Sequence, residues 1–369
     1  HSAIEPLKIK IIGGKDKMKI SQKSKKLISV LIVLFFAFGA VGTTIEALAP
    51  EITGTEWKGT PQVFRVNTEP SGVRAIPYAD EESALTFDFE GSQYYKSLNG
   101  IWKFHWSENP NVRPVDFYKE DYNVDDWDEI PVPSNWQIYG YGQIIYLNQS
   151  HPWQGYGRIS PPQVPIEHNE VGSYRTTFTI PENWSGRDIY ISFQGVKTAY
   201  YVWVNGQFVG YSEDSFTSHD FNITEFVKEG ENILAVEVYR WSDGAWLENQ
   251  DMIDLSGIFR DVYLYSKPTV HIRDYTVRTD LDDDYVNADL FLRVNVRNNS
   301  EGVPEAHKVE AMLYDWENNP VFEEPMVYDI NFQEDEDEVV AEQEKTVINP
   351  LKWSAEKPNL YKLGFSADH

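Results

Sequence analysis

The sequence of 369 residues predicts an all-β protein in which a jelly-roll β-sandwich is followed by an immunoglobulin-like β-sandwich. Short segments with alternating apolar and polar residues recur along the chain, and this period of two is that of a half-buried strand. No long segment has the period of an amphipathic helix, and many short strands without helices are typical of sandwiches. The composition, with 41% hydrophobic residues, is that of a globular protein with a sizeable core.

Residues 1–49 are predicted to be upstream residues and a secretory signal peptide. Four lysines between residues 19 and 26 precede an apolar run at residues 27–41, and a basic region before an apolar region is typical of a signal peptide. The run approaches the length of about 17 residues that a membrane span needs, so an uncleaved membrane anchor is the alternative. We therefore expect an exported protein, either periplasmic or extracellular.

The jelly-roll sandwich is predicted at residues 91–267. Its strands are expected in seven segments rich in aromatic and β-branched residues, at residues 101–106, 173–179, 188–193, 200–204, 207–211, 234–238 and 262–265. Asn205 and Gly206 separate two of these segments, and such a pair forms a tight hairpin turn because both positions take a positive φ. The segment 139–165, rich in glycine, proline and aromatic residues, is expected to be a loop that shapes a pocket.

The immunoglobulin-like sandwich is predicted at residues 268–369. Alternation at residues 270–279, 287–296 and 308–314 predicts three of its strands, and their spacing is typical of this type of sandwich. The acidic run at residues 334–344 is expected to be a solvated loop. The chain ends at His369, where a last strand is expected, so we expect this domain to be truncated.

The charge of the chain limits its partners. The formal net charge of −26 argues against nucleic acid, which needs a basic surface, and it disfavours an anionic membrane surface. A neutral glycan is compatible with this charge. The chain has no cysteine, which excludes disulfides and thiolate zinc sites.

The segment between the strands at 234–238 and 262–265 has a composition that suits a sugar. It contains several carboxylates and tryptophans, among them Asp243, Trp246 and Asp251. A carboxylate accepts hydrogen bonds from neighbouring hydroxyls, and an indole face covers apolar C–H groups. An acidic surface loop with incidental tryptophans has the same composition, so composition alone leaves both interpretations open.

The order of residues in five segments adds a family resemblance. These segments are RWSDG at 240–244, NQDM at 249–252, SGIFRDV at 256–262, SLNGIW at 97–102 and VPSNWQ at 132–137. Together they resemble the N-terminal portion of a glycoside hydrolase family 2 β-galactosidase of the lactose-operon type. In that family the two sandwiches precede a TIM barrel with two catalytic glutamates, and nothing in this chain matches the barrel. The resemblance therefore implies a fragment without catalytic residues, inactive on its own.

The resemblance also implies two groups of site residues. Asp251 matches the family aspartate that reaches into the galactose site and helps to hold a sodium ion. Asn148, in the segment IYLN at residues 145–148, matches an asparagine that touches the bound galactose. Glu56, Glu213 and Asp243 match positions of a peripheral magnesium site between the arm and the jelly roll.

The implied function is the hydrolysis of terminal non-reducing β-D-galactose residues in β-galactosides, with retention of configuration. Sodium and magnesium are the ions expected for the parent enzyme, a homo-oligomer is its expected state, and residues 50–90 resemble an N-terminal arm that supports subunit contacts. The alternatives are a stand-alone secreted carbohydrate-binding module, or a fragment of a β-glucuronidase or a β-mannosidase. Asn148 and the segment NQDM favour a galactosidase. His151 stands where many members carry a tyrosine, so the pocket is expected to differ in detail.

Overall fold

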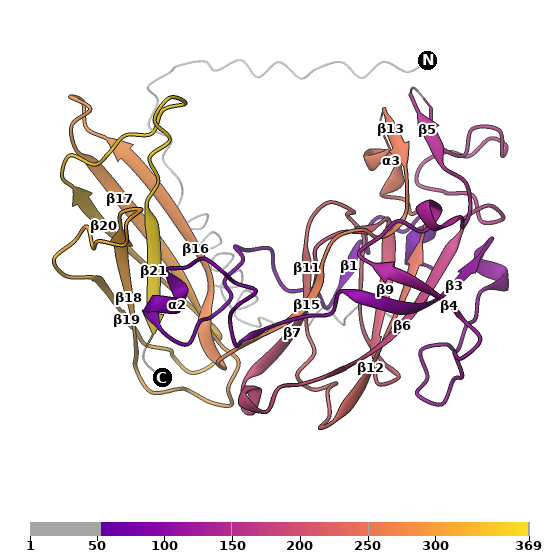
Figure 1. The fold of residues 1–369 in the computed structure, drawn as a ribbon, viewed down its shortest axis with the longest axis horizontal. Helices are drawn as coiled ribbons and strands as arrows, with labels where there is room; N and C mark the ends of the chain where they lie inside the picture. Colours follow the sequence, from indigo (N-terminus) through magenta and orange to yellow (C-terminus); the bar gives the residue numbers. More distant parts are fainter. Residues whose placement is uncertain (1–52, 149, 250, 368–369) are drawn as a thin grey trace, which may run out of the picture. The chain divides into compact units, whose positions relative to one another are not determined.

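The computed structural model describes residues 53–148, 150–249 and 251–367. Most of the regular structure in these residues is β-strand, arranged as two sandwiches (Figure 1). The predicted all-β fold class is confirmed. The predicted signal peptide lies outside the described residues, and within those residues no helix is long and apolar enough to cross a membrane.

The first sandwich packs a seven-stranded sheet on a four-stranded sheet, and all neighbouring strands in both are antiparallel. The larger sheet has the order β1 (Arg65–Val66), β10 (Gln207–Ser212), β9 (Ala199–Val204), β12 (Glu231–Tyr239), β6 (Val171–Thr179), β3 (Gly100–Ser107) and β4 (Asp128–Val132). The smaller sheet has the order β11 (His219–Asn222), β7 (Asp188–Phe193), β15 (Val262–Lys267) and β2 (Tyr95–Ser97).

The central strand β12 is buried on both faces. Leu234, Val236 and Val238 are fully buried in the core between the two sheets. Tyr239 points to the other face, where its ring stacks on Trp57 of the N-terminal arm with 4.5 Å between ring centroids. The alternation that predicted this strand therefore separates two apolar surfaces, and the arm covers the outer one.

The turn between β9 and β10 confirms the hairpin prediction. Asn205 has φ 50° and Gly206 has φ 78°, the left-handed pair that a two-residue hairpin turn requires. The Asn205 side chain also fixes the turn to the next strand, because its Oδ1 accepts a hydrogen bond from Ile233 N at 2.9 Å.

The first part of the arm lies along the first sandwich, whereas residues 81–85 contact the second, where Tyr314 and Lys362 donate hydrogen bonds to Glu81 Oε1 and Leu85 O. The arm contains the 3-10 helix η1 (Glu56–Lys58), strand β1 and the short helix α2 (Glu81–Ala84), whose Asp80 cap accepts from Ser83 N. Strand β1 pairs with β10 and so extends the larger sheet at its edge. Three further 3-10 helices in the first sandwich are η2 (Pro110–Val112), η3 (Trp136–Tyr139) and η4 (Glu182–Trp184).

Two short antiparallel ribbons and one helix lie outside the main sheets. One ribbon pairs β5 (Ile145–Leu147) with β13 (Met252–Asp254), and the other pairs β8 (Val196–Lys197) with β14 (Gly257–Ile258). Helix α3 (Ala245–Glu248) precedes β13. Strand β5 lies inside the segment that we predicted as a loop. The sequence did not predict it because a three-residue strand paired with a distant segment leaves no local periodic signal.

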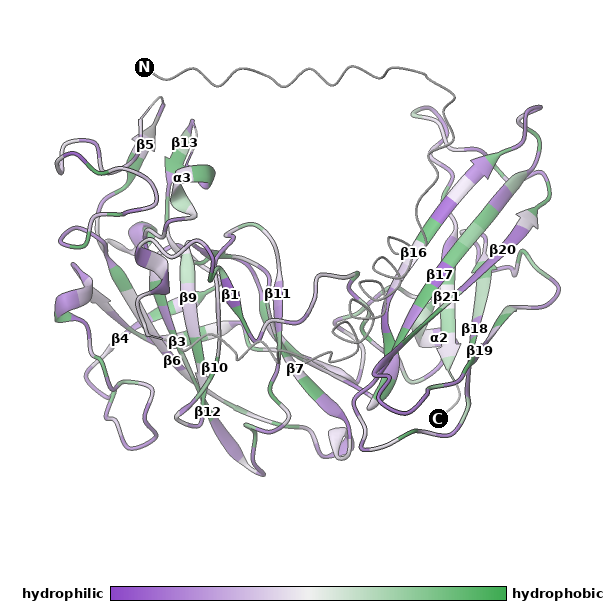
Figure 2. Cartoon of the chain, turned by 180° about the vertical axis from the view of Figure 1, so that it is seen from behind, coloured by the Kyte–Doolittle hydropathy of each residue, from purple (hydrophilic) through white to green (hydrophobic). Residues whose placement is uncertain are grey.

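The second sandwich consists of two three-stranded sheets. One has the order β16 (Val270–Leu281), β17 (Ala288–Asn298) and β20 (Glu338–Val347), and the other has the order β19 (Met326–Ile330), β18 (His307–Tyr314) and β21 (Lys362–Ala367). Leu292, Val294, Ala311 and Ile330 are fully buried between them. The predicted strands at 270–279, 287–296 and 308–314 are confirmed, and Figure 2 shows hydrophobic and hydrophilic residues alternating along these strands.

The prediction that the acidic run at residues 334–344 is a solvated loop is wrong for its second half. Strand β20 pairs with β17 along its length. Glu342 and Glu344 are exposed, whereas Ala341 and Val347 pack against the core of the second sandwich. The run is thus an amphipathic edge strand, and acidic side chains on its outer face protect that edge from pairing with other chains.

Candidate functional site

The ribbon of β5 and β13 brings the two predicted galactose-binding residues to the same end. In its antiparallel register Leu147 lies opposite Met252. Asn148 follows Leu147 and Asp251 precedes Met252, so the two residues leave the ribbon together, and both are exposed. The ribbon and α3 lie side by side at one end of the first sandwich (Figure 1).

Tyr146 joins these two residues on the same surface. Its hydroxyl donates a hydrogen bond to Asp251 Oδ1 at 2.6 Å, and this bond raises the pKa of the phenol. Side chains alternate along a strand, so Tyr146 and position 148 belong to one face of β5, and Asp251 shares that face across the ribbon. Tyr146 is not among the site residues predicted from the sequence, although its spacing of two residues from Asn148 places both on the same face of a strand.

The outer face of the ribbon offers both hydrogen bonds and apolar contact. Asp251 supplies a carboxylate and Asn148 an amide, while the ring of Tyr146 is 64% exposed and Ile253 is 53% exposed. A carboxylate accepts from hydroxyls, and an amide both donates and accepts. Such a face suits a ligand that combines several hydroxyls with apolar C–H groups.

The inner face of the ribbon is anchored by buried charges. Asp254 is fully buried, and its carboxylate oxygens lie 3.1 Å from Lys197 Nζ and 3.2 Å from Arg240 Nη2. Trp241 Nε1 donates to the same carboxylate at 3.2 Å. Arg240 Nη1 also pairs with Glu170 Oε1 at 2.7 Å. Because β13 carries Asp254, this network fixes the ribbon to the body of the sandwich.

An aromatic cluster follows β5 in the chain. The His151 ring stacks on Trp153 at 5.2 Å and contacts Trp246 of α3 at 4.1 Å, and the two indoles lie 4.9 Å apart. Burial lowers the pKa of His151, so at neutral pH the imidazole is uncharged and packs as an aromatic ring. The departure from the family at this position is therefore accommodated within an aromatic cluster.

The neighbouring carboxylates have structural partners. Ser215 N and Oγ donate to Glu248 at 2.7 and 2.5 Å, so Glu248 ties α3 to the segment after β10. Asp254 is held by two cations, as described above. Neither carboxylate is placed as a free nucleophile or acid beside Asp251.

Comparison with known proteins identifies the family. The model described as glycosyl hydrolases family 2, sugar binding domain, matches residues 95–268, and the model described as glycosyl hydrolases family 2 matches residues 270–369. The chain belongs to glycosyl hydrolase family 2. The first match spans both sheets of the first sandwich except strand β1, and it includes the β5–β13 ribbon. The second match spans the second sandwich. The family 2 chain contains no TIM barrel in the residues that the structure describes.

Curated relatives of this family 2 chain include β-galactosidases. The enzyme of Priestia megaterium is 43% identical over 325 residues, which are 88% of this chain and 31% of the relative. The enzyme of Clostridium acetobutylicum is 42% identical over 308 residues, which are 84% of this chain and 33% of the relative. The chain thus spans about a third of the length of these curated relatives.

Solved structures confirm the fold of this family 2 portion. A β-glucuronidase of Bacteroides uniformis has a TM-score of 0.60 at 20% identity, over 74% of this chain and 30% of that one. A β-glycosidase of Bacteroides vulgatus has a TM-score of 0.55 at 23% identity, over 74% of this chain and 32% of that one. At these identities the likeness concerns the fold alone.

Two of the three predicted magnesium ligands come together. Glu213 and Asp243 contact each other through their carboxyl groups, and burial together with this contact raises the pKa of Glu213, while burial raises that of Asp243. Asp243 Oδ2 is buried and has no hydrogen-bond partner among the described residues. Two buried carboxylates with an unsatisfied oxygen are the donor set that a hard cation such as magnesium accepts.

The third predicted ligand is engaged elsewhere. Glu56 Oε2 accepts from the hydroxyl of Tyr201 at 2.5 Å, and its Oε1 accepts from Thr53 N at 2.6 Å. Within the described ranges, no three acidic or histidine side chains gather into a metal-binding group. The chain itself therefore offers a magnesium ion two carboxylates, and it offers a sodium ion one exposed carboxylate, that of Asp251.

Proposed function

We propose that this chain is the substrate-positioning part of a β-galactosidase that removes terminal non-reducing β-D-galactose from β-galactosides. The observation that carries the proposal is the register of the β5–β13 ribbon, which unites Asn148 and Asp251 on one exposed face. The identity to β-galactosidases of two bacteria supports galactose as the sugar.

The proposed roles follow from the chemistry of the outer face. The Asp251 carboxylate accepts hydrogen bonds from galactose hydroxyls, and the Asn148 amide donates to or accepts from a neighbouring hydroxyl. Tyr146, through its bond to Asp251 Oδ1, holds the carboxylate in one orientation. Retaining hydrolysis requires two further carboxyl groups about 5 Å apart across the scissile bond, and these belong to the catalytic barrel of the whole enzyme.

Ions and assembly are part of the proposal. Asp251 contributes one ligand to a sodium ion beside the sugar. Glu213 and Asp243 hold a magnesium ion, which relieves the repulsion between their buried carboxylates. The arm supports subunit contacts in a homo-oligomer, and residues 1–49 direct export.

The test compares Asp251→Asn and Asn148→Ala in the enzyme that carries this chain together with its catalytic barrel. Loss of a charge-assisted hydrogen bond to the sugar is expected to lower kcat/KM roughly ten- to a hundredfold for Asp251→Asn. Asn148→Ala should cost less, because a neutral amide makes weaker bonds. Only the aspartate variant should weaken activation by sodium. Asp284→Asn, an exposed acidic residue of the second sandwich, is the matched control.

The outcomes separate the proposal from its alternatives. If both site variants match the control in kcat/KM and in sodium dependence, Asn148 and Asp251 are ordinary surface residues and the proposal fails. The isolated chain should not hydrolyse a chromogenic β-galactoside. Tight binding of galactose by the isolated chain, lost with Asp251→Asn, would instead indicate a self-sufficient carbohydrate-binding module.

A further inference from the structure

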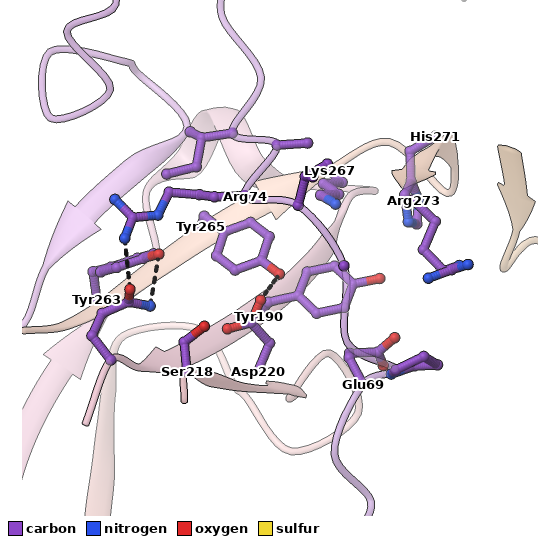
Figure 3. A pocket seen from close by; sticks show the side chains of 16 residues that line it. Glu69, Arg74, Tyr190, Ser218, Asp220, Tyr263, Tyr265, Lys267, His271 and Arg273 are labelled. Carbon is purple, nitrogen blue, oxygen red and sulfur yellow. Dashed lines mark hydrogen bonds between the residues drawn. The ribbon is translucent and has the colours of Figure 1, made fainter. Parts of the chain in front are cut away.

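A polar cavity lies where the arm meets strands β7, β11 and β15 and the first residues of β16 (Figure 3). Its volume is about 60 Å³. By the same measure, a cavity needs roughly 10–15 Å³ to hold one water, so this cavity has room for a few waters or for one small ion. The β5–β13 ribbon contributes no residue to it.

Lys267, the last residue of β15, lines this cavity. Its side chain is buried, with the residue only 7% exposed. Among the described residues it has no hydrogen bond and no ion pair, and its nearest aromatic contacts are the rings of Tyr265 at 5.6 Å and Tyr190 at 6.0 Å. An ammonium in this largely buried position has lost most of its hydration without gaining a paired anion, so an anion in the cavity would stabilise it.

The carboxylates that line the cavity are engaged with other groups. Glu69 Oε2 pairs with Arg297 Nη1 at 3.2 Å. Asp220 Oδ2 accepts from the hydroxyl of Tyr265 at 2.7 Å, and its Oδ1 accepts from the hydroxyl of Ser192. Figure 3 shows the bond from Tyr265 to Asp220. Neither carboxylate therefore makes a direct ion pair with the lysine.

The other two cations of the lining are also engaged. Arg273 forms a double hydrogen bond with Glu338 at 2.6 and 2.9 Å, and Arg74 donates to Gln194 Oε1 at 2.6 Å. The lining thus contains three cations, Arg74, Lys267 and Arg273, against two carboxylates, which is a net charge of +1. This excess is notable in a chain whose net charge is −26.

Of two further residues in the lining, Tyr190 can donate a hydrogen bond to an anion and His271 is uncharged. Asn299 Nδ2 donates to the Tyr190 hydroxyl at 3.1 Å, which leaves the phenolic O–H available as a donor. His271 Nδ1 lies 2.8 Å from Pro268 O, and burial holds the pKa of His271 down to about 3, so it adds no charge. Burial lowers the pKa of Lys267 to about 8, and the lysine is therefore still protonated at pH 7.

We propose that this cavity binds a small oxyanion, a phosphate or a carboxylate, on the Lys267 ammonium and the Tyr190 hydroxyl. The ligand joins the arm to both sandwiches, because the cavity is lined by arm residues 69–76, by β7 and β15, and by His271 and Arg273 of β16. The anion is thus a structural ligand of the junction. A ligand that binds only the folded state stabilises that state by RT ln(1 + c/Kd) at ligand concentration c, an amount that keeps rising with the logarithm of the concentration above Kd.

The experiment measures thermal unfolding of the chain at pH 7 and constant ionic strength, with sodium chloride replaced stepwise by sodium phosphate or by sodium acetate. We expect the midpoint to rise with the concentration of at least one of these anions, in proportion to the logarithm of that concentration above Kd. Comparison of the two titrations shows whether the phosphate or the carboxylate is the preferred form. Lys267→Met should remove the part of the rise that is due to this site, whereas Lys228→Met, at an exposed lysine on the same sandwich, should retain the full rise.

A second measurement needs no variant and covers the case in which Lys267→Met fails to fold. Dimethylation with formaldehyde and a borohydride at pH 7.5 is followed by peptide mass spectrometry. Phosphate or acetate should reduce the labelling of Lys267 at least severalfold and leave Lys228 unchanged. The proposal is overturned if neither anion raises the midpoint of the wild type, if Lys267→Met responds like the wild type, or if neither anion changes the labelling of Lys267.

Discussion

Replacing Asp254 by asparagine is expected to destabilise the first sandwich by about 3–5 kcal/mol, the cost of breaking a buried ion pair by removing one partner. The residue is fully buried between Lys197 Nζ and Arg240 Nη2, at 3.1 and 3.2 Å. The side chains of these two cations are only 4% and 1% exposed. In the variant, Arg240 keeps its ion pair with Glu170. Among the described residues, Lys197 is then left as a buried charge without an ion pair.

The pair of Glu120 and Lys228 is the matched control. Its N–O distance of 2.6 Å is shorter than either distance to Asp254, but its side chains are 48% and 50% exposed. Water screens such a pair, and exposed pairs contribute about 0–1 kcal/mol. Glu120→Gln should therefore lower the free energy of unfolding by less than 1 kcal/mol or so, although it removes the closer contact.

Tryptophan fluorescence in a urea titration measures both variants. The buried tryptophans that the structure describes all precede Pro268, so the signal reports on the first sandwich rather than the second. Hydrogen exchange adds a local readout, because the amides of β13 should lose protection in Asp254→Asn before the amides of β12 do. Equal destabilisation by Asp254→Asn and Glu120→Gln would refute the reasoning, since it would mean that burial does not set the cost.

Two other variants probe the backbone and the second sandwich. Gly206→Ala should lower stability by about 1 kcal/mol, because φ is 78° there while a Cβ would meet nothing closer than 3.9 Å; an unchanged urea midpoint would contradict this. The hydrogen bonds from Arg273 hold the pKa of Glu338 down to about 2, so their stabilisation is complete above the unfolded pKa of about 4.5 and is lost as the pH falls towards 2. Glu338→Gln should lower the free energy of unfolding by about 1–2 kcal/mol at pH 6, after allowance for solvent screening, and should remove this loss of stability in acid. A variant whose stability falls with acid as steeply as that of the wild type would refute the assignment.

The strands of the fold were predictable where packing follows a period of two. Leu234, Val236 and Val238 show how the pattern works, since each enters the core between the sheets. The prediction of a loop at residues 334–344 failed because it weighed charge above alternation: Val339 and Ala341 pack against the core although acidic residues lie on either side of this short segment. Alternation, not charge, decides whether a segment can pair as an edge strand.

The sequence motifs predicted two residues of the site but not how these residues come together. The resemblance assigned Asn148 and Asp251, but their proximity depends on the pairing of β5 with β13, which no local pattern specifies. The bond from Tyr146 to Asp251 follows from that same register. Lys267 ends a strand in the sequence like many surface lysines, and its burial depends on the arm and on β16 closing over it.

Asp251 and Asp254 show how one short strand gives the same chemical group two different environments. They are three residues apart, and because side chains alternate along a strand, an odd separation places them on opposite faces. Asp254 is fully buried among cations, whereas Asp251 is exposed and bonded to a phenol. The buried carboxylate fixes β13 to the sandwich, and pairing with β5 then sets where the exposed carboxylate stands. In the proposed enzyme the position of the galactose-binding group thus depends on a buried ion network that never touches the sugar.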